Sequence, residues 1–409
     1  MAPPPDPPKD SVLQEMWTML DKHSVFDCPV KAVRRPTSAS TSNTAVDDGD
    51  VVVLTGTTGR LGTYLLAQLL ASRRVRKIYA LNRENATPLR ERQAQAFRTY
   101  NFDVALLDVA AEKLSLLVGD MTRHNLGLPY EVYEEIRQSV TVIISNAWTS
   151  TLSVKAPLAR FEPLIKGLKN LVHLSLSSPR DSPPLLAFVS TIMVWWNHPP
   201  MEAKTEELIA DPYVSAHGGY SKSKWVAESL LGRAAKSHGL PVAILRVTQL
   251  CGDTRTGSWN IDEWLPALVH LSQLQGVRAV PLYAMKRTSR DAGTLRVLNV
   301  VHPIAVPGSV VSTGISAATG LPIIPALVWV DRVRTGPLAA NALSRASLYW
   351  FEQVLTKPEL ELHFEIARTM GSSATMRALV EPALNVEEVR GWVEWLTLNR
   401  RGTGAIARL

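Results

Sequence analysis

A tyrosine and a lysine four residues apart form a pair that could move a proton: Tyr220 and Lys224, in the segment Tyr220-Ser221-Lys222-Ser223-Lys224. On a helix this spacing places both side chains on one face, one turn apart. An ammonium group near a phenol favours the phenolate, so we expect Lys224 to lower the pKa of Tyr220 towards the working pH. The phenol could then pass a proton to or from a carbonyl oxygen. Taken alone, this motif more often belongs to an ordinary amphipathic helix surface.

Hydroxyl groups precede this helix by one connection. Ser190 and Thr191 close an apolar segment at 185–190 that is typical of a strand. A hydroxyl at the end of that strand could orient the same carbonyl oxygen as the phenol. We therefore take Thr191, Tyr220 and Lys224 as the candidate catalytic residues. Together they suit proton transfer that accompanies hydride transfer, provided that a dinucleotide binds beside them.

A glycine-rich turn supplies that second requirement. Four aliphatic residues, Val51 to Leu54, lead directly into Thr55-Gly56-Thr57-Thr58-Gly59-Arg60-Leu61-Gly62, after which leucines recur at helical spacing. Gly56 permits a tight turn, Gly59 lets the backbone approach a pyrophosphate, and Gly62 lets the helix pack against the strand. Free amides at the helix start then face the phosphates. The expected cofactor contacts in this turn are Thr55, Gly56, Thr58, Gly59, Arg60, Leu61 and Gly62.

The end of the second strand indicates which dinucleotide binds. The sequence there is Tyr79-Ala80-Leu81-Asn82-Arg83, where an NAD enzyme usually carries an acid for the ribose hydroxyls. A guanidinium at this place can pair with a 2′-phosphate, so Arg83 favours NADPH over NADH. Arg60 points the same way more weakly. The alternative is that Arg83 is an ordinary surface arginine.

Polar residues also follow the third and fourth strands. Asp120 could accept a hydrogen bond from the adenine amino group, and Asn146 falls where the nicotinamide ribose is expected. Either residue alone is more often part of a turn. Their placement at successive strand ends makes them candidate cofactor contacts, together with Tyr220 and Lys224 on the catalytic helix.

Strands and helices alternate from Val51 onwards, which predicts the fold class. Strands separated by helices cannot pair as hairpins, so they form a Rossmann-like α/β fold with a doubly wound parallel sheet. The expected strands are 51–55, 76–81, 115–118, 141–145, 185–190 and 241–247, and the expected helices are 60–72, 88–100, 130–138, 157–176 and 220–237. Ligands should bind at the carboxyl ends of the strands.

The chain thus divides into three parts. Residues 1–50 are expected to be a disordered tail and linker with one short helix at 13–22, and residues 51–250 an NADP-binding domain. Residues 251–409 are expected to form a smaller, mostly helical cap that shapes the substrate pocket. In the cap we expect helices at 261–275, 305–319, 339–356, 359–370 and 386–398 and one strand at 295–301.

Composition excludes several classes of protein. The chain has 409 residues, an apolar fraction of 46% and a formal charge of +7, without long runs of like charge. No apolar run approaches the ~20 residues of a membrane span, and the N-terminus lacks a signal-peptide pattern. The two cysteines have no metal-ligand spacing and cannot form a disulfide framework. We expect a cytoplasmic, monomeric enzyme that binds no metal, membrane or nucleic acid.

These motifs resemble a known family. TGTTGRLG, the strand-end Thr191 and Tyr220-x-x-x-Lys224 are similar to the extended short-chain dehydrogenase/reductase superfamily. More closely, the chain resembles the terminal thioester reductase domain of fungal nonribosomal-peptide-synthetase-like enzymes, a group that includes α-aminoadipate reductases and carboxylic acid reductases. The segments that carry the resemblance are LTGTTGRLGTYLLAQLL, YALNR, GDMTRHNLGL, SNAW, FVSTI, GYSKSKWVAESLL and RVTQLCGDTRTGSWNIDEWLP.

The resemblance implies an activity. Family members take an acyl chain from the phosphopantetheine arm of a carrier domain and release it as an aldehyde, using NADPH. By position, Thr191, Tyr220 and Lys224 would be catalytic. The implied cofactor contacts are Gly56, Gly59, Gly62, Arg83, Asp120 and Asn146.

Two departures from the family pattern bear on the substrate. The resemblance begins near the place where the family's carrier domain ends, so we expect an acyl-carrier protein or acyl-CoA to be supplied in trans. After Val280-Pro281 only LYAMKRTSRDAGT intervenes where relatives have a longer segment. Either the cap is trimmed or an exon is missing from the gene model.

Two other functions stay open at this stage. The same residues could reduce a free aldehyde or ketone without a carrier. A non-catalytic, cofactor-sensing protein would keep the glycines but would not need the Tyr220–Lys224 pair. The sequence does not indicate the acyl group, nor whether a second round of reduction gives an alcohol.

Overall fold

The computed structural model describes most of the chain. The described residues are 9–28, 49–109, 111–149, 156–199, 202–248, 250–253, 256–259, 263–275, 284–288, 295–304, 308–337, 339, 348, 351–352, 361–379 and 385–400. The proline-rich start and residues 29–48 of the expected linker lie outside them. Among the described residues, no helix is both long enough and apolar enough to cross a bilayer.

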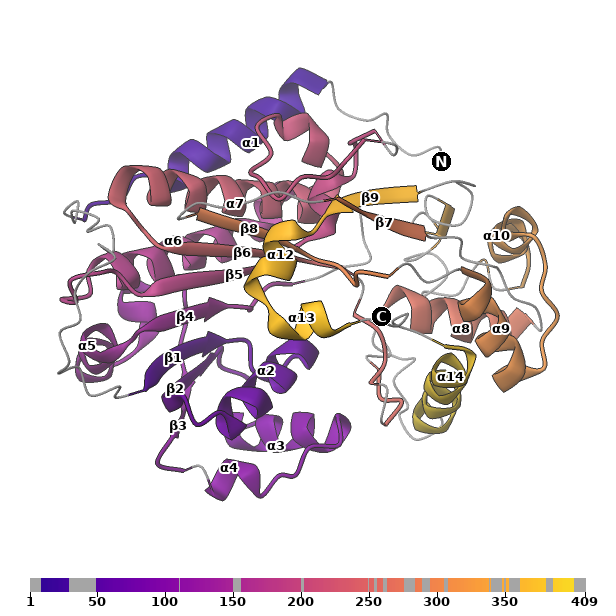
Figure 1. The fold of residues 1–409 in the computed structure, drawn as a ribbon, viewed down its shortest axis with the longest axis horizontal. Coiled ribbons are helices and arrows are strands. Elements are labelled where there is room, and N and C mark those ends of the chain that lie inside the picture. Colours follow the sequence, from indigo (N-terminus) through magenta and orange to yellow (C-terminus); the bar gives the residue numbers. More distant parts are fainter. Residues whose placement is uncertain are drawn as a thin grey trace.

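A parallel sheet of seven strands forms the centre of the molecule, in the order β3-β2-β1-β4-β5-β6-β8 (Figure 1). The strands are β1 (Asp50–Thr55), β2 (Val75–Asn82), β3 (Leu114–Val118), β4 (Val142–Ser145), β5 (Leu185–Thr191), β6 (Val242–Val247) and β8 (Leu295–Val300). Every strand expected from the sequence is present, and the Rossmann-like α/β prediction is confirmed. The strand order reverses between β1 and β4, which is where ligands bind in such sheets.

Helices cover both faces of the sheet. They are α2 (Arg60–Ala71), α3 (Leu89–Thr99), α4 (Leu106–Val109), α5 (Tyr130–Ser139), α6 (Glu162–Leu176) and α7 (Gly218–His238). Short 3-10 turns occur at η1 (His124–Gly127), η2 (Leu158–Phe161), η3 (Ile192–Trp195) and η4 (Pro212–Ser215). The sheet and its helices thus form three layers, as the alternating sequence pattern predicted.

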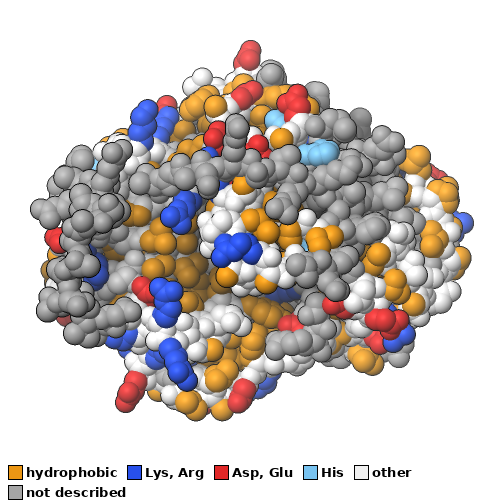
Figure 2. Space-filling view, viewed as in Figure 1, with side chains coloured by type: hydrophobic (Ala, Val, Ile, Leu, Met, Phe, Trp, Pro, Cys, Tyr) orange, Lys and Arg blue, Asp and Glu red, His pale blue; other side chains and the backbone are white. Residues whose placement is uncertain are grey.

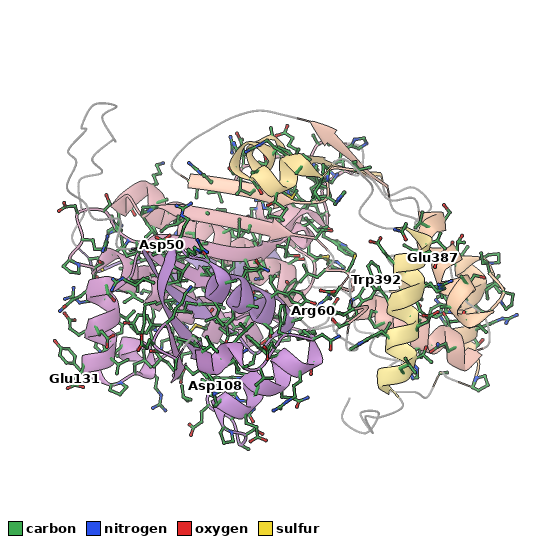
Figure 3. All side chains as sticks on the ribbon, turned by 60° about the horizontal axis from the view of Figure 1, so that its bottom comes forward. Asp50, Arg60, Asp108, Glu131, Glu387 and Trp392 are labelled. Carbon is green, nitrogen blue, oxygen red and sulfur yellow. The ribbon has the colours of Figure 1, made fainter. Side chains whose placement is uncertain are left out.

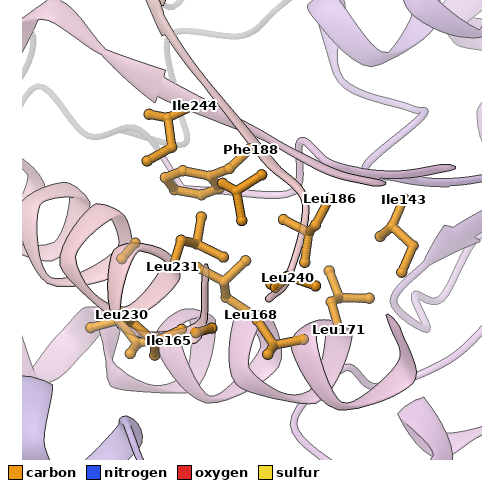
Figure 4. Close-up of a cluster of buried hydrophobic side chains, with 14 of the residues drawn as sticks. Ile143, Ile165, Leu168, Leu171, Leu186, Phe188, Leu230, Leu231, Leu240 and Ile244 are labelled. Atoms are coloured by element: carbon orange, nitrogen blue, oxygen red, sulfur yellow. The ribbon is translucent and has the colours of Figure 1, made fainter. Parts of the chain in front are cut away.

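Two apolar cores explain why β1 is a continuous aliphatic run. Val51 and Val53 pack into the core on the side of α6 and α7, whereas Val52 and Leu54 pack into the core on the side of α2 and α3. A strand that is buried on both faces has no polar alternation. Figure 4 shows the first of these cores, where leucines of α6 and α7 meet Phe188 of β5.

Helix α1 (Lys9–His23) confirms the short helix expected at 13–22 and packs against the body of the molecule. Met16 is fully buried in the larger core, and the ring of Trp17 meets the edge of Trp225 on α7 at 5.1 Å between centroids. Lys222 of α7 also pairs with Glu15, at 3.1 Å. The outer face of α7 is therefore fixed by α1.

The C-terminal region forms a helical unit with a core of its own, seen beside the sheet in Figure 1. Its helices are α8 (Trp264–Gln275), α9 (Gly308–Thr319), α10 (Ala326–Thr335) and α14 (Val386–Arg400). Trp259, Trp329 and Trp392 are buried in its centre. The helices expected at 261–275, 305–319 and 386–398 are confirmed, α10 was not expected, and most of 339–356 lies outside the described residues.

The helix expected at 359–370 is wrong over its first half. The structure has a strand there, β9 (Glu361–Glu365), before the short helices α12 (Ala367–Ser372) and α13 (Ala374–Ala378). Strand β9 pairs with β7 (Ala284–Thr288) in a separate two-stranded parallel sheet. Phe364 and Ile366 are buried, whereas His363 and Glu365 are partly exposed, which is the alternation of a strand. Pairing with a distant segment has overridden the local helical tendency.

Candidate active site

Strand β5 and helix α7 bring the three candidate catalytic residues together. Thr191 is the last residue of β5 and is almost completely buried, while Tyr220 lies in the first turn of α7 and is partly exposed. The Thr191 side chain lowers the pKa of the Tyr220 phenol, so the two groups interact. The hydroxyl and the phenol can therefore reach the same small volume at the carboxyl edge of the sheet.

Lys224 lies one turn further along α7 and is enclosed, with 2% of its surface exposed. Its Nζ donates a hydrogen bond to the carbonyl oxygen of Val189, at 2.6 Å. The same nitrogen lies 4.3 Å from the ring centroid of Trp148 and 4.6 Å from that of Phe188. Rings at this distance attract a cation, so they offset part of the cost of burying the amine.

Trp148 was not singled out in the sequence analysis, although it ends the segment SNAW. Its indole N–H donates to Ser223 Oγ at 3.3 Å, and its ring meets Phe188 edge-on at 5.3 Å between centroids. These contacts fix the ring against Lys224. A tryptophan directly after a strand-end Asn-Ala is the only signal that the sequence offers for this role.

The expected influence of Lys224 on Tyr220 is wrong for this structure. Burial raises the pKa of Tyr220 to about 12, because the Thr191 side chain offsets only part of this rise. Burial also lowers the pKa of Lys224 well below its ordinary value, against the attraction of the Glu228 carboxylate. Desolvation is the largest cause of the pKa shift in both groups. The phenol is consequently protonated at neutral pH, which is the form that donates to a carbonyl oxygen.

The glycine turn fits a dinucleotide. Gly56 has a φ of +71° and lies against Ala147, where a Cβ would come within 2.9 Å of the Ala147 Cα. A Cβ on Gly62 would lie 2.0 Å from the carbonyl oxygen of Gly56. A Cβ on Gly59 would meet nothing nearer than 3.5 Å. Gly56 and Gly62 are thus required by the turn itself, whereas Gly59 leaves its outer face open for a phosphate.

Thr55 and Asn146 hold this turn in place. The Thr55 hydroxyl accepts the backbone N–H groups of Asn146 and Ala147, at 3.0 and 2.9 Å. The Asn146 side-chain amide donates to the carbonyl oxygens of Thr55 and Gly56, at 3.3 and 3.2 Å. The ends of β1 and β4 are therefore joined at the point where the strand order reverses. Thr58 and Leu61, the other expected contacts of the turn, are both partly exposed.

Arg83 is exposed at the end of β2, and none of the described carboxylates forms an ion pair with it. Its carbonyl oxygen accepts a hydrogen bond from the guanidinium of Arg92, at 2.8 Å. Two arginines therefore lie together at this strand end. Arg92 was not predicted, because it comes from the following helix, α3.

Asp120 forms a turn after β3. Its Oδ1 accepts hydrogen bonds from the backbone N–H and the hydroxyl of Thr122, at 2.9 and 2.7 Å, and these bonds lower its pKa. Its other oxygen pairs with Arg123 at 3.4 Å. These contacts are those of a turn-forming aspartate, and contact with an adenine stays a prediction.

Arg60 joins the glycine turn to the cap. Its guanidinium donates to Glu263 Oε1 at 3.3 Å and to the carbonyl oxygen of Leu250 at 3.2 Å, while Glu263 also accepts the indole N–H of Trp259 at 3.0 Å. In Figure 3, Arg60 lies at the end of the sheet that faces Trp392 on α14, opposite Asp50. The side chain is thus directed at the cap, and contact with a 2′-phosphate stays a prediction.

The chain is similar in sequence to known proteins. Residues 54–290 match the model of an NAD-binding family that is described as "Male sterility protein". The adenylate-forming reductase Nps10 of Heterobasidion annosum is 33% identical over 379 residues, which cover 85% of this chain and 34% of that protein. The chain spans about a third of the length of the curated relatives that it matches.

Solved structures share the fold. The terminal R domain from the myxalamid PKS-NRPS biosynthetic pathway superposes with a TM-score of 0.73 and 21% identity, covering 96% of this chain and 99% of that one. A thiolation-reductase di-domain from an archaeal non-ribosomal peptide synthetase gives a TM-score of 0.68 and 16% identity, covering 97% of this chain and 82% of that one. At these identities, the likeness shows the fold.

Replacing Lys224 by methionine should stabilise the protein in the absence of cofactor. Because the pKa of Lys224 is lowered on folding, the unfolded chain binds more protons than the folded one below pH ~10.5, and stability falls as the pH falls. We expect Lys224→Met to raise the free energy of unfolding at pH 7 by about 1–3 kcal/mol, with a gain that shrinks as the pH approaches 10.5. Urea unfolding between pH 6 and pH 10 measures this.

Lys236→Met is the matched control, since Lys236 lies on the same helix but is exposed. It should change stability by less than about 0.5 kcal/mol at every pH. A loss of stability in Lys224→Met at neutral pH would contradict the expectation that burial of the Lys224 amine destabilises the folded protein.

Proposed function

Because the chain belongs to the NAD-binding family described as "Male sterility protein", we propose that it is an NADPH-dependent reductase of an acyl thioester. The acyl group would be held on a carrier protein or on CoA and released as an aldehyde. The observation that carries the proposal is the placement of Thr191 beside Tyr220, with Lys224 one turn away, on the strand edge that also holds the glycine turn.

Residues around the strand order reversal would hold the cofactor. The open face of Gly59 and the amides that begin α2 suit its pyrophosphate, and Lys224 would hold the nicotinamide ribose. Arg83, with Arg92 beside it, suits a 2′-phosphate, because a guanidinium recognises phosphate oxygens better than ribose hydroxyls. When bound, NADPH supplies the hydride for the reduction.

The protein's own groups would act on the substrate oxygen. Thr191 and the protonated Tyr220 would donate hydrogen bonds to the thioester carbonyl, and these bonds strengthen as negative charge develops on that oxygen. Tyr220 holds the proton that this oxygen needs, since its raised pKa keeps the phenol protonated. Collapse of the tetrahedral species would return the proton to Tyr220 and expel the pantetheine thiolate, which takes a proton from solvent, so that aldehyde and thiol are formed.

Charge favours a carrier protein as the donor of the acyl group. The chain has a formal charge of +7, and Figure 2 shows Lys and Arg side chains along the middle of one face, beside apolar side chains. Such a surface attracts an acidic partner and speeds its encounter. One solved structure with this fold is described as a thiolation-reductase di-domain, which supports a carrier as partner. We propose that the carrier is supplied in trans.

Cofactor preference gives one prediction. Arg83→Ala should weaken NADPH binding by about 1.5–3 kcal/mol, the scale of a charged hydrogen bond, and leave NADH binding little changed. Titration of both cofactors by fluorescence measures this, with Arg98→Ala, an exposed arginine on α3, as the control. Equal losses for NADPH and NADH would exclude Arg83 as the 2′-phosphate ligand.

The activity itself is tested with a panel of substrates. Purified protein and NADPH are incubated with acyl-carrier, acyl-CoA and acyl-pantetheine thioesters, with a free aldehyde, and with a free acid plus ATP, and products are identified by mass. We expect aldehyde from the thioesters and none from the free acid. Added salt should slow the acyl-carrier reaction more than that of the small thioester, because only the former depends on charge steering.

Tyr220→Phe is the matched variant in this assay. It should bind NADPH normally and reduce thioesters at least roughly 10²-fold more slowly, since the general acid is gone. Tyr213→Phe removes a nearby, partly exposed phenol and should change nothing. Fast reduction of free aldehydes together with inertness to every thioester would favour the alternative, a free aldehyde or ketone reductase.

A further inference from the structure

A third ionisable residue shares the face of α7 that carries the catalytic pair. Glu228 follows Lys224 by four residues, as Lys224 follows Tyr220, so the three side chains lie at successive turns. The Glu228 carboxylate is 1% exposed and pairs with Arg246 of β6, which is fully buried. The Arg246 Nη2 donates to Glu228 Oε2 at 2.6 Å and its Nε donates to Oε1 at 3.1 Å.

This ion pair also contacts the strand end that carries Thr191. The Ser190 hydroxyl donates to Glu228 Oε1 at 2.5 Å, and Ser190 lies between Val189, which accepts the Lys224 hydrogen bond, and Thr191. The Glu228 carboxylate is therefore hydrogen-bonded to β5. This strand provides the Val189 carbonyl oxygen for Lys224 and ends at Thr191.

Arg246 fixes the carboxylate from the other side. Its guanidinium donates to the carbonyl oxygens of Thr205 and Glu207, at 3.1 and 2.8 Å, and lies 5.1 Å from the ring of Trp195. Trp195 ends the turn η3, which follows Thr191 directly. These contacts fix the Glu228–Arg246 pair, so the Glu228 carboxylate stays between α7 and β5.

We propose that Glu228 is a positioning residue of this site: it fixes the end of β5 beside Thr191 and presents its carboxylate to Lys224. The proposal deepens the proposed function and rests on it, because it assumes that Lys224 works in its charged form.

Electrostatics agrees with this geometry. The charge of Glu228 raises the pKa of Lys224, against the larger lowering caused by burial. The Trp148, Phe188 and Tyr220 rings and the Val189 carbonyl oxygen lie around the Lys224 amine, and Arg246 of β6 pairs with Glu228. Lys222 on the same helix is engaged with Glu15 of α1. Glu228 is therefore a carboxylate that acts on Lys224.

Glu228→Gln tests the proposal through the pH dependence of turnover. Glutamine keeps the shape and can still accept from Ser190, but it removes the negative charge and leaves Arg246 positive. Loss of that negative charge beside a guanidinium that stays positive lowers the pKa of Lys224. We expect the alkaline limb of the kcat profile to move to lower pH by about one unit, with a roughly 10-fold lower rate on that limb.

Two further variants separate positioning from simple stability. Glu206→Gln alters another buried carboxylate, which accepts hydrogen bonds from Asn299 and Thr369, neither of them on α7, so its alkaline limb should not move. Arg246→Met leaves Glu228 unneutralised and should move the limb in the opposite direction, to higher pH. Arg246→Met also tests the proposal if the Glu228→Gln variant does not fold. Limbs that stay in place in both Glu228→Gln and Arg246→Met would overturn the proposal.

The readout does not depend on the identity of the substrate. If wild-type protein reduces only free aldehydes, the proposed thioester activity fails, while the pH profiles are recorded with the aldehyde. If neither substrate is reduced, the affinity for NADP⁺ is titrated between pH 6 and pH 10 in the same variants. The pH above which binding weakens should fall in Glu228→Gln and rise in Arg246→Met, and an unchanged value in both would overturn the proposal.

Discussion

Burial of one amine sets the conditions for the whole site. Lys224 is enclosed between the Trp148 and Phe188 rings and donates to the Val189 carbonyl oxygen at 2.6 Å. An enclosed amine is tolerated only where such partners are held in position, because desolvation penalises its charged form. Leucines on the inner face of α7 pack against Phe188 and supply that rigidity, so apolar packing places Tyr220 beside Thr191 (Figure 4).

The parallel sheet brings the remaining parts to one edge. Strands β1, β4 and β5 end side by side, so Thr55, Asn146 and Thr191 lie on the same rim although they are distant in sequence. The cap is attached to that rim through Arg60 and Glu263, which link the glycine turn to the helical unit. The glycine turn and the Thr191–Tyr220 pair therefore lie on the edge of the sheet to which the cap is attached.

Local patterns predicted much of this arrangement, and long-range packing decided the rest. The aliphatic runs, the glycine turn and the i, i+4 spacing of Tyr220 and Lys224 depend only on neighbours in sequence, and the structure has the corresponding elements. The direction of the Tyr220 pKa depends on burial, which no local pattern reveals. Trp148, the Glu228–Arg246 pair and the β7–β9 pairing likewise join segments far apart in the chain.

The central claim is that burial lowers the pKa of Lys224 in the protein without cofactor, and that a bound dinucleotide raises this pKa again. Calorimetry of NADP⁺ binding at pH 8, in buffers of different ionisation enthalpy, counts the protons taken up, because the 2′-phosphate is already ionised at this pH. The account predicts net proton uptake by wild-type protein, up to about one per chain, and none by Lys224→Met. Equal proton uptake by both proteins, or none by either, would contradict it.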